Sequence, residues 1–236
     1  MKWTRCPLQG SYHGIYQRIL DAQARCLSYE LETMILHESD LVFDFDDAIW
    51  QVKKYDDHRY YKKFSGVGLK GVDFIGIYKQ EKVVFIEVKN FRDKHPTHQE
   101  PFKVLKETKA FINHIGDKLE DTFRATTAIQ GYFRKKWWYR LYLTWQSLLP
   151  KRWFLHRDWL FWHQVHQLAQ QKDKIEFVLW LEIEERISEK GKKDLSNHID
   201  NMLEEQLLEF TNEVIVASIK HPVYQHALIV TFRNSL

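Results

Sequence analysis

Three ionisable residues, Asp73, Glu87 and Lys89, stand at the ends of two apolar, β-branched runs in the segment 71–90, GVDFIGIYKQEKVVFIEVKN. The runs cover residues 74–78 and 83–88, and the polar residues 79–82 between them indicate a tight β-hairpin. Asp73 opens the first strand, whereas Glu87 and Lys89 close the second. All three therefore lie at the end of the hairpin away from its turn.

The alternation of side chains along a strand sorts the second run into two faces. One face carries Glu87 and Lys89 together with Val83 and Phe85. The opposite face is wholly apolar and consists of Val84, Ile86 and Val88, which we expect to pack against a helix.

The length of the turn decides whether Asp73 shares the face of Glu87. A two-residue turn sets Asp73 opposite Val88, whereas a three-residue turn over 79–81 sets it opposite Glu87. A metal site shared by the two carboxylates needs the second arrangement, with Ile75 opposite Phe85. We therefore predict a turn of odd length or an equivalent bulge.

Two interpretations fit this group of charges. Glu87 and Lys89 could form the solvated rim of an amphipathic strand. Alternatively, because buried charges are normally paired or bound to metal, the Asp73 and Glu87 oxygens could hold Mg²⁺, and Lys89 beside them could hold a water or a phosphate.

The pattern Asp73, thirteen residues, then Glu87-Val88-Lys89 on a hairpin resembles the PD-(D/E)XK superfamily of restriction-endonuclease-like nucleases. Val72 stands where that family has its proline. The resemblance covers about residues 14–185 as an order of elements, and the hairpin alone as a motif. It implies that Asp73 and Glu87, helped by the Val88 carbonyl, bind the metal, and that Lys89 orients or activates the attacking water.

What the resemblance implies for function is a nuclease that hydrolyses DNA phosphodiester bonds with Mg²⁺, for which Mn²⁺ would substitute. One alternative is a nucleic-acid-binding module of the same fold that does not cleave. Another is an interaction protein that assembles a complex, or a homodimer, through an aromatic segment at 133–162.

A helix is predicted over residues 14–36, with Glu30 near the middle of its apolar face and Glu32 almost opposite. A glutamate on a buried stripe needs a partner, which an arginine could supply. In many members of the resembled superfamily a glutamate of the first helix completes the metal site, so Glu30 is the candidate for a fourth ligand.

The rest of the chain alternates between strands and helices. Residues 41–55 predict one or two short strands with a turn at Asp46-Asp47, and residues 56–70 predict a basic loop whose glycines, Gly66 and Gly68, and Gly71 after it, allow close backbone approach. That loop is either a phosphate contact over the site or an ordinary connection. Further elements are expected at 102–115 (helix), from 118 into the 140s (helix, after a break at 116–117), 174–184 (half-buried strand), 195–218 (acidic helix) and 227–232 (strand).

The segment 133–162 holds six of the nine tryptophans and seven Lys or Arg against one acid, Asp158. Aromatic and basic residues in alternation can stack on unpaired bases and hold phosphates, and they also suit a dimer interface or a membrane surface. The nucleic-acid-binding candidates along the chain are basic residues of loops and helices: Arg59, Lys62, Lys63, Lys70, Lys106, Arg134, Lys135 and Lys136.

Length and composition predict one domain over residues 1–236, with a helical, basic and aromatic insertion at about 117–170. The resemblance implies that its fold is α/β, a mixed β-sheet of the restriction-endonuclease type flanked by helices. Residues 1–163 carry 27 Lys and Arg against 20 Asp and Glu, so this part is the expected polyanion face. Two cysteines, Cys6 and Cys26, no apolar leader and no run as long as a membrane span favour a cytoplasmic protein.

Overall fold

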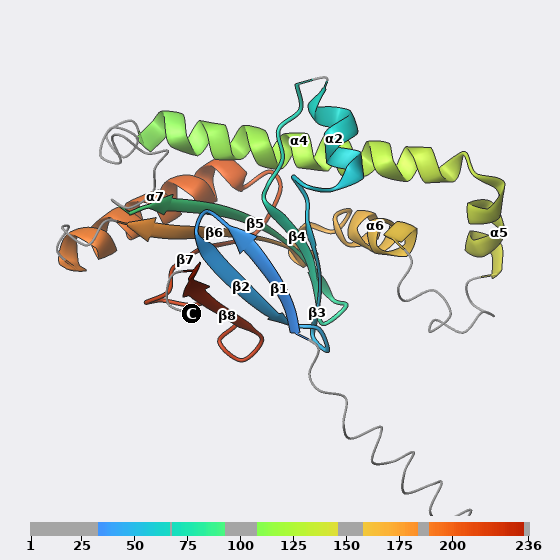
Figure 1. Ribbon diagram of the computed structural model, residues 1–236. Helices are drawn as coiled ribbons and strands as arrows, with labels where there is room; N and C mark the ends of the chain where they lie inside the picture. The colour runs from blue at the N-terminus through green and yellow to red at the C-terminus, as the bar shows by residue number, and fades with distance from the viewer. Residues whose placement is uncertain (1–32, 67, 93–107, 146–157, 184–188, 234–236) are drawn as a thin grey trace, which may run out of the picture. The chain divides into compact units, whose positions relative to one another are not determined.

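The computed structural model describes residues 33–66, 68–92, 108–145, 158–183 and 189–233 (Figure 1). Contacts divide the chain into two units, residues 1–33 and 34–236, and the fold described below is that of the second unit. The described residues do not include most of the predicted helix 14–36, of which only residues 33–36 are described. The candidate ligand Glu30 and the basic candidate Lys106 also lie outside the described residues.

The second unit contains two β-sheets. Strands β3 (Trp50–Lys54), β4 (Phe74–Tyr78), β5 (Lys82–Phe91), β6 (Ile175–Ile183) and β7 (Glu213–Ala217) form a five-stranded sheet in that order. The β3–β4 and β4–β5 pairs are antiparallel, whereas the β5–β6 and β6–β7 pairs are parallel. Strands β1 (Thr33–Glu38), β2 (Leu41–Asp46) and β8 (Leu228–Phe232) form a second sheet, in the order β1-β2-β8. The α/β class predicted from the sequence is confirmed.

Helices cover one face of the five-stranded sheet and the three-stranded sheet covers the other (Figure 1). The helices are α2 (Arg59–Ser65), α4 (Thr108–Arg134), α5 (Trp137–Trp145), α6 (Asp158–Leu168) and α7 (Glu189–Leu207), with a short 3-10 turn η2 (Lys172–Lys174) before β6. Each face of the sheet has its own apolar core. On the helical side Phe85 of β5 packs with Leu119 of α4, and on the other side Phe74 packs with Phe43.

The hairpin has the register that the metal-site hypothesis requires. Tyr78 pairs with Lys82 and Ile75 with Phe85, so residues 79–81 form a three-residue turn and the next step of this register sets Asp73 opposite Glu87. Lys79 and Gln80 both have left-handed backbone angles, with φ of 48° and 59°. The Glu81 N–H donates to the Tyr78 carbonyl at 3.0 Å, which closes the turn.

The apolar face of β5 lies away from the site, but its partner differs from the prediction. Val84, Ile86 and Val88 pack in the core shared with the three-stranded sheet, not against a helix. The reason is the second sheet itself, whose strand β8 lies more than 180 residues along the chain from its neighbour β2 and left no local signal.

Strand β6 is buried on both faces, so the prediction of a half-buried strand at 174–184 is wrong in this respect. The alternating acids that suggested a solvent face are satisfied inside the protein. Glu176 is 2% exposed and bonds Lys82 and the Tyr224 hydroxyl, and Glu182 accepts from the Trp180 indole at 3.0 Å and the Ile219 N–H at 2.7 Å.

Two helix boundaries also differ from the predictions. Helix α4 runs without a break through Gly116, whose role is close packing: a Cβ there would meet Gln206 of α7 at 3.2 Å. The predicted acidic helix at 195–218 ends at Leu207 and is followed by strand β7, so its last part was assigned to the wrong element.

Two further segments were assigned to the wrong class. The end of the predicted first helix, residues 34–36, belongs to strand β1. Part of the predicted loop 56–70 forms the short helix α2, whose Tyr60 contacts the rings of Phe133 and Trp162. Tertiary contacts of this kind stabilise a helix that local periodicity does not reveal.

Among the described helices, none combines the length and the apolar character that crossing a membrane requires. The strands at 41–55, with a turn after Asp46, and the final strand at 227–232 agree with the structure.

The hairpin turn generates the first prediction. Ordinary residues in left-handed conformations cost roughly 1 kcal/mol each, and an Asn-Gly pair adopts them readily. We expect the double substitution Lys79→Asn, Gln80→Gly to raise the thermal midpoint by about 2–6 °C, measured by circular dichroism. Glu81→Gly, outside the two left-handed positions, is the control and should not raise it. A double variant no more stable than the parent would contradict the assigned turn.

Candidate active site

Asp73 is held at the start of β4 by three backbone contacts. The Val72 N–H donates to the Thr122 hydroxyl of α4 at 3.1 Å, and the Tyr55 N–H donates to the Asp73 carbonyl at 2.8 Å. The Asp73 Oδ2 atom accepts from the Val88 N–H at 2.7 Å. The chain passes tightly here, since a Cβ at Gly71 would meet the Tyr55 ring at 2.6 Å, and this is the close approach that the glycine implied.

Glu87 is fully buried and faces helix α4 from the middle of β5. Its Oε1 atom accepts from Lys118 Nζ of α4 at 2.7 Å and pairs with Lys89 Nζ at 2.5 Å. Its Oε2 atom is buried and has no hydrogen-bond partner within the described part of the chain. Lys118 Nζ also lies 3.9 Å from Asp73 Oδ1, so this one lysine links the two carboxylates.

A second acidic group shares Asp73 but not Glu87. One carboxylate oxygen each of Glu38, Asp56 and Asp73 lies within 4.8 Å of the others. Glu38 ends β1 and Asp56 follows β3, so three separate parts of the sheet region meet here. Lys54 offsets part of this charge, with Nζ 3.0 Å from Glu38.

The site therefore contains four carboxylates and three lysines, and the pKa values reflect this. Burial and the negative charge of Glu87 raise the pKa of Asp73 from 3.8 to about 7, although Lys118, Lys89 and the Val88 N–H oppose the shift. Burial alone would lower the pKa of Lys118, but the charges of Glu87 and Asp73 outweigh burial and raise it. Burial also raises the pKa of Asp56, against the influence of Lys54.

These residues fit a divalent cation with oxygen ligands. The unpartnered Glu87 Oε2, the raised pKa of Asp73 and the clustered oxygens of Glu38 and Asp56 all describe negative charge that the lysines do not fully compensate. A cation bound to Asp73 would oppose the effects of burial and of Glu87, which raise the pKa of this carboxyl.

The sequence prediction located part of this group and missed the rest. The structure brings Asp73, Glu87 and Lys89 together, and it assigns the Val88 N–H, rather than its carbonyl, to Asp73. The Val88 carbonyl as a metal ligand stays a prediction. Glu38, Asp56 and Lys118 were missed, since Asp56 lies in a charged stretch without periodicity and nothing local distinguishes Lys118 from Lys109, the other lysine of α4.

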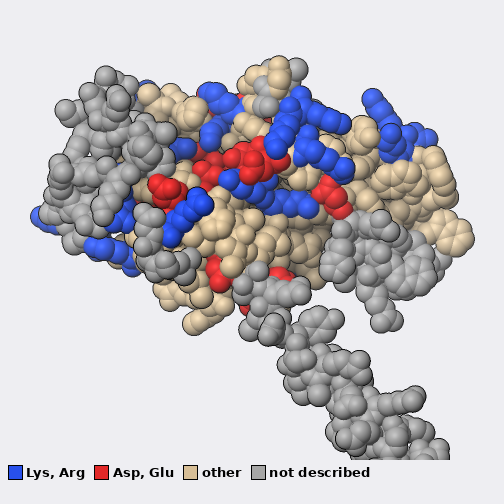
Figure 2. All heavy atoms as spheres, in the orientation of Figure 1, with Lys and Arg blue, Asp and Glu red and all other residues tan. Residues whose placement is uncertain are grey.

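Of the basic candidates, Lys70 lies nearest to the site. Its Nζ atom is 3.3 Å from His114 Nδ1 and 3.5 Å from Asp117, on the turn of α4 that precedes Lys118. Lys62 and Lys63 are exposed on α2. Figure 2 shows Asp and Glu side chains gathered on the face drawn, with Lys and Arg side chains beside them.

The remaining basic candidates have other roles in the fold or lie further along the chain. Arg59 donates to Asp158 at 2.8 Å, and Asp158 also bonds Lys53 and His58, so the Arg59 guanidinium is already engaged. Lys136 lies over the Tyr132 ring at 4.7 Å. Arg134 and Lys135 are exposed at the end of α4, about 24 Å along the helix from Lys118.

Comparison with known proteins adds no family to this description. No protein-family model, no curated protein and no solved structure matches the chain.

The raised pKa of Asp73 generates the second prediction. Between pH 4 and pH 7 the unfolded state ionises this carboxyl and the folded state does not, so the stability of the wild type falls over that range and levels off above it. Asp73→Asn removes the effect and keeps an acceptor for the Val88 N–H. The variant should be more stable by up to about 4 kcal/mol at pH 8 and by much less at pH 5. Urea unfolding at both pH values measures the difference.

Asp173→Asn, at an exposed position of η2, is the matched control and should show a difference that does not change with pH. A stability gain for Asp73→Asn that is equal at pH 5 and pH 8 would contradict the raised pKa.

Proposed function

We propose that this chain is a metal-dependent nuclease that hydrolyses DNA phosphodiester bonds, with the PD-(D/E)XK arrangement of residues. The observation that carries the proposal is the register of the β4–β5 hairpin, which sets Asp73 opposite Glu87 and puts Lys89 on the same face. One helical lysine lies within reach of both carboxylates. An Asp–Glu–Lys string that arose by chance would not be expected to meet at one buried position.

Asp73 and Glu87 would hold Mg²⁺ or Mn²⁺, with Glu38 and Asp56 as further oxygen ligands on the other side of Asp73. The bound ion would supply Lewis acidity toward a phosphoryl oxygen and a lowered pKa for a water. Lys118 lies between the carboxylates and would keep them from repelling each other when no ion is bound.

Lys89 would act on the reacting groups. Its ammonium is anchored to Glu87 Oε1, and its side chain is 22% exposed, so its remaining N–H groups can reach a water or a phosphate oxygen. In this position Lys89 would orient the water for in-line attack and offset the charge that develops on the phosphoryl oxygens.

The substrate class rests on charge. Residues 1–163 carry a surplus of seven basic residues, and the exposed cations Lys62 and Lys63 of α2 and Lys70, which lies beside Asp117 of α4, belong to this part. This distribution supports a polyanion that lies across α2 and the adjoining turn of α4.

A second candidate function is assembly with another protein through helix α5. Trp137, Leu141 and Trp145, at spacings of four residues, are 73%, 51% and 53% exposed and form an apolar stripe. Large apolar side chains on one exposed helix face are typical of interaction surfaces. This role is compatible with the same catalytic hairpin.

The third prediction concerns cleavage. Asp73→Ala and Lys89→Ala should each lower the rate of cleavage of plasmid, linear and single-stranded DNA in Mg²⁺ by at least roughly a hundredfold, because each removes a group that acts in the transition state. Asp173→Ala and Lys190→Ala, at exposed positions outside the candidate active site, are the charge-matched controls and should cut at the parental rate.

Full activity in both hairpin variants would contradict the nuclease assignment. If the parent binds DNA but cuts neither DNA nor RNA in Mg²⁺ or Mn²⁺, the chain is the non-cleaving module of the same fold.

The fourth prediction concerns the substrate path. Lys62→Ala with Lys63→Ala should weaken DNA binding for all sequences and reduce the slope of log K against log salt by roughly 2, since each phosphate contact releases about one counterion. Fluorescence anisotropy between 50 and 200 mM salt measures the slope. Lys190→Ala with Lys193→Ala, exposed on α7, changes the net charge equally and should leave the slope as it is. An equal effect of both pairs would remove α2 from the path.

A further inference from the structure

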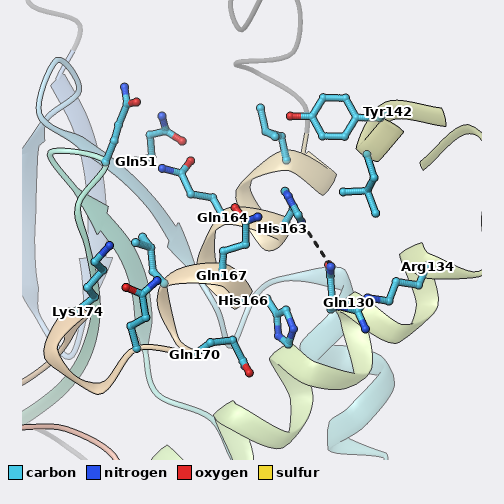
Figure 3. Close-up of a pocket in the computed structure, with 15 residues that line it drawn as sticks. Gln51, Gln130, Arg134, Tyr142, His163, Gln164, His166, Gln167, Gln170 and Lys174 are labelled. Atoms are coloured by element: carbon cyan, nitrogen blue, oxygen red, sulfur yellow. Dashed lines mark hydrogen bonds between the residues drawn. The ribbon is translucent and has the colours of Figure 1, made fainter. Parts of the chain in front are cut away.

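A groove of about 870 Å³ lies at the other end of the sheet from the candidate active site (Figure 3). Helix α6 lines it along one face, the β4–β5 turn with the neighbouring residues of β3 and η2 forms one side, and the end of α4 with α5 forms the other. The turn is about 20 Å from Glu87 along β5, so the groove is separate from the carboxylates.

The composition of the groove is unusual. Seven glutamines and two histidines line it, Arg134 and Lys174 are its charged residues, and it contains no Asp or Glu among the described lining residues. Figure 3 shows Lys174 on one side of the groove and Arg134 on the other. Neither cation has a carboxylate within ion-pair distance in the described ranges, unlike Arg59 and Lys82 elsewhere in the fold.

The deepest part of the groove holds a buried polar network. The Tyr139 hydroxyl lies 2.6 Å from His163 Nδ1, and Gln130 Nε2 donates to the same hydroxyl at 2.7 Å. Gln130 and His163 are 3% and 5% exposed. Their remaining polar atoms, Gln130 Oε1 and His163 Nε2, have no hydrogen-bond partner among the described residues.

The single proton of the Tyr139 hydroxyl determines which of these two atoms is a hydrogen-bond donor and which is an acceptor. Because this hydroxyl accepts from Gln130, it donates to His163 Nδ1, which leaves the proton of the imidazole on Nε2. Nε2 is then a donor and Gln130 Oε1 an acceptor. If the amide is turned over, both roles are exchanged, so the pair has one donor and one acceptor in either case.

The histidines contribute hydrogen bonds rather than charge. Burial, His166 and Arg134 lower the pKa of His163, and burial and Arg134 lower that of His166, so both rings are neutral at pH 7. The positive charge of the groove therefore comes from Arg134 and Lys174.

From this combination we infer that the groove binds a nucleotide. Arg134 and Lys174 would hold phosphate oxygens, as Arg and Lys do in phosphate sites. The glutamine amides along the groove offer both donors and acceptors, which match the edge of a nucleobase. A volume of this size accommodates such a ligand. The inference does not depend on the nuclease assignment.

The experiment is isothermal titration of the full-length protein, without divalent ion, with ATP, GTP, CTP and UTP. At least one should bind, and adenosine or guanosine alone and tripolyphosphate alone should bind at least roughly tenfold more weakly, because each lacks one half of the contacts. Arg134→Ala and Lys174→Ala should each weaken the nucleotide by roughly tenfold, the size expected for a charge-assisted hydrogen bond.

The controls keep the residue type and the element. Arg124→Ala, on α4 and paired with Glu120, and Lys172→Ala, beside Lys174 on η2 but outside the lining, should bind the nucleotide within about twofold of the parent. Gln130→Glu, which puts a negative charge at the base of the groove, should abolish binding. A circular dichroism melt would establish whether Gln130→Glu is folded. If it is not folded, Arg134→Ala and Lys174→Ala test the inference without it.

Three results would overturn the inference: no binding of any of the four nucleotides, equal losses in the groove and control variants, or tripolyphosphate binding as tightly as the nucleotides. Tighter binding of a single-stranded oligonucleotide than of any mononucleotide, lost in Arg134→Ala and Lys174→Ala, would also overturn it and make the groove part of a nucleic-acid path. The cleavage assay with the Asp73 and Lys89 variants does not depend on any of these outcomes. A failure of the nucleotide inference therefore does not decide the nuclease proposal.

Discussion

The burial of Glu87 is the constraint on which the rest of this structure depends. A fully buried carboxylate in the middle of a sheet costs several kcal/mol unless charge compensates it, and here Lys89 from its own strand and Lys118 from helix α4 do so. Asp73 then adds a second acid beside it, and Lys118 reaches this one at 3.9 Å. Helix α4 therefore lies against the sheet in a position in which Lys118 reaches both carboxylates.

The same part of α4 also anchors the strand that begins after Asp73. The same turn of the helix that presents Lys118 presents Thr122, whose hydroxyl donates to the Lys118 carbonyl at 2.7 Å and accepts from the Val72 N–H. The strand that begins with Asp73 is thereby anchored to the helix that neutralises it. A break at Gly116 would separate the Thr122–Val72 contact from the apolar packing of Phe111 and Ile112 in the same helix. The helix is continuous at Gly116, and the missing side chain lets α7 pack closely there.

The local parts of the fold were predictable, and the parts that depend on distant contacts were not. The hairpin and the shared face of Glu87 and Lys89 follow from alternation within twenty residues. Alternation left the length of the turn open, and the odd turn that the structure has was predicted only because a metal site shared by Asp73 and Glu87 requires it. Glu38, Asp56 and Lys118 come from three other elements, and only the assembled sheet brings them to Asp73. Likewise β6 was predicted to be half buried because the sequence does not reveal the distant partners of its acids, such as Tyr224 for Glu176 and the Ile219 N–H for Glu182. Local patterns do not contain such long-range partners.

The two ends of β5 differ in a way that follows from the turn. Near Glu87 the polar groups are carboxylates and the lysines that pair with them. Near the turn they are amides and neutral imidazoles, with cations only at the sides of the groove. Both ends depend on Lys79 and Gln80 adopting left-handed angles, because a turn shorter by one residue would rotate Asp73 to the other face of the sheet, into the apolar core of Phe43 and Phe74. A modest conformational cost in the turn thus determines, about 20 Å away, whether two carboxylates can share an ion.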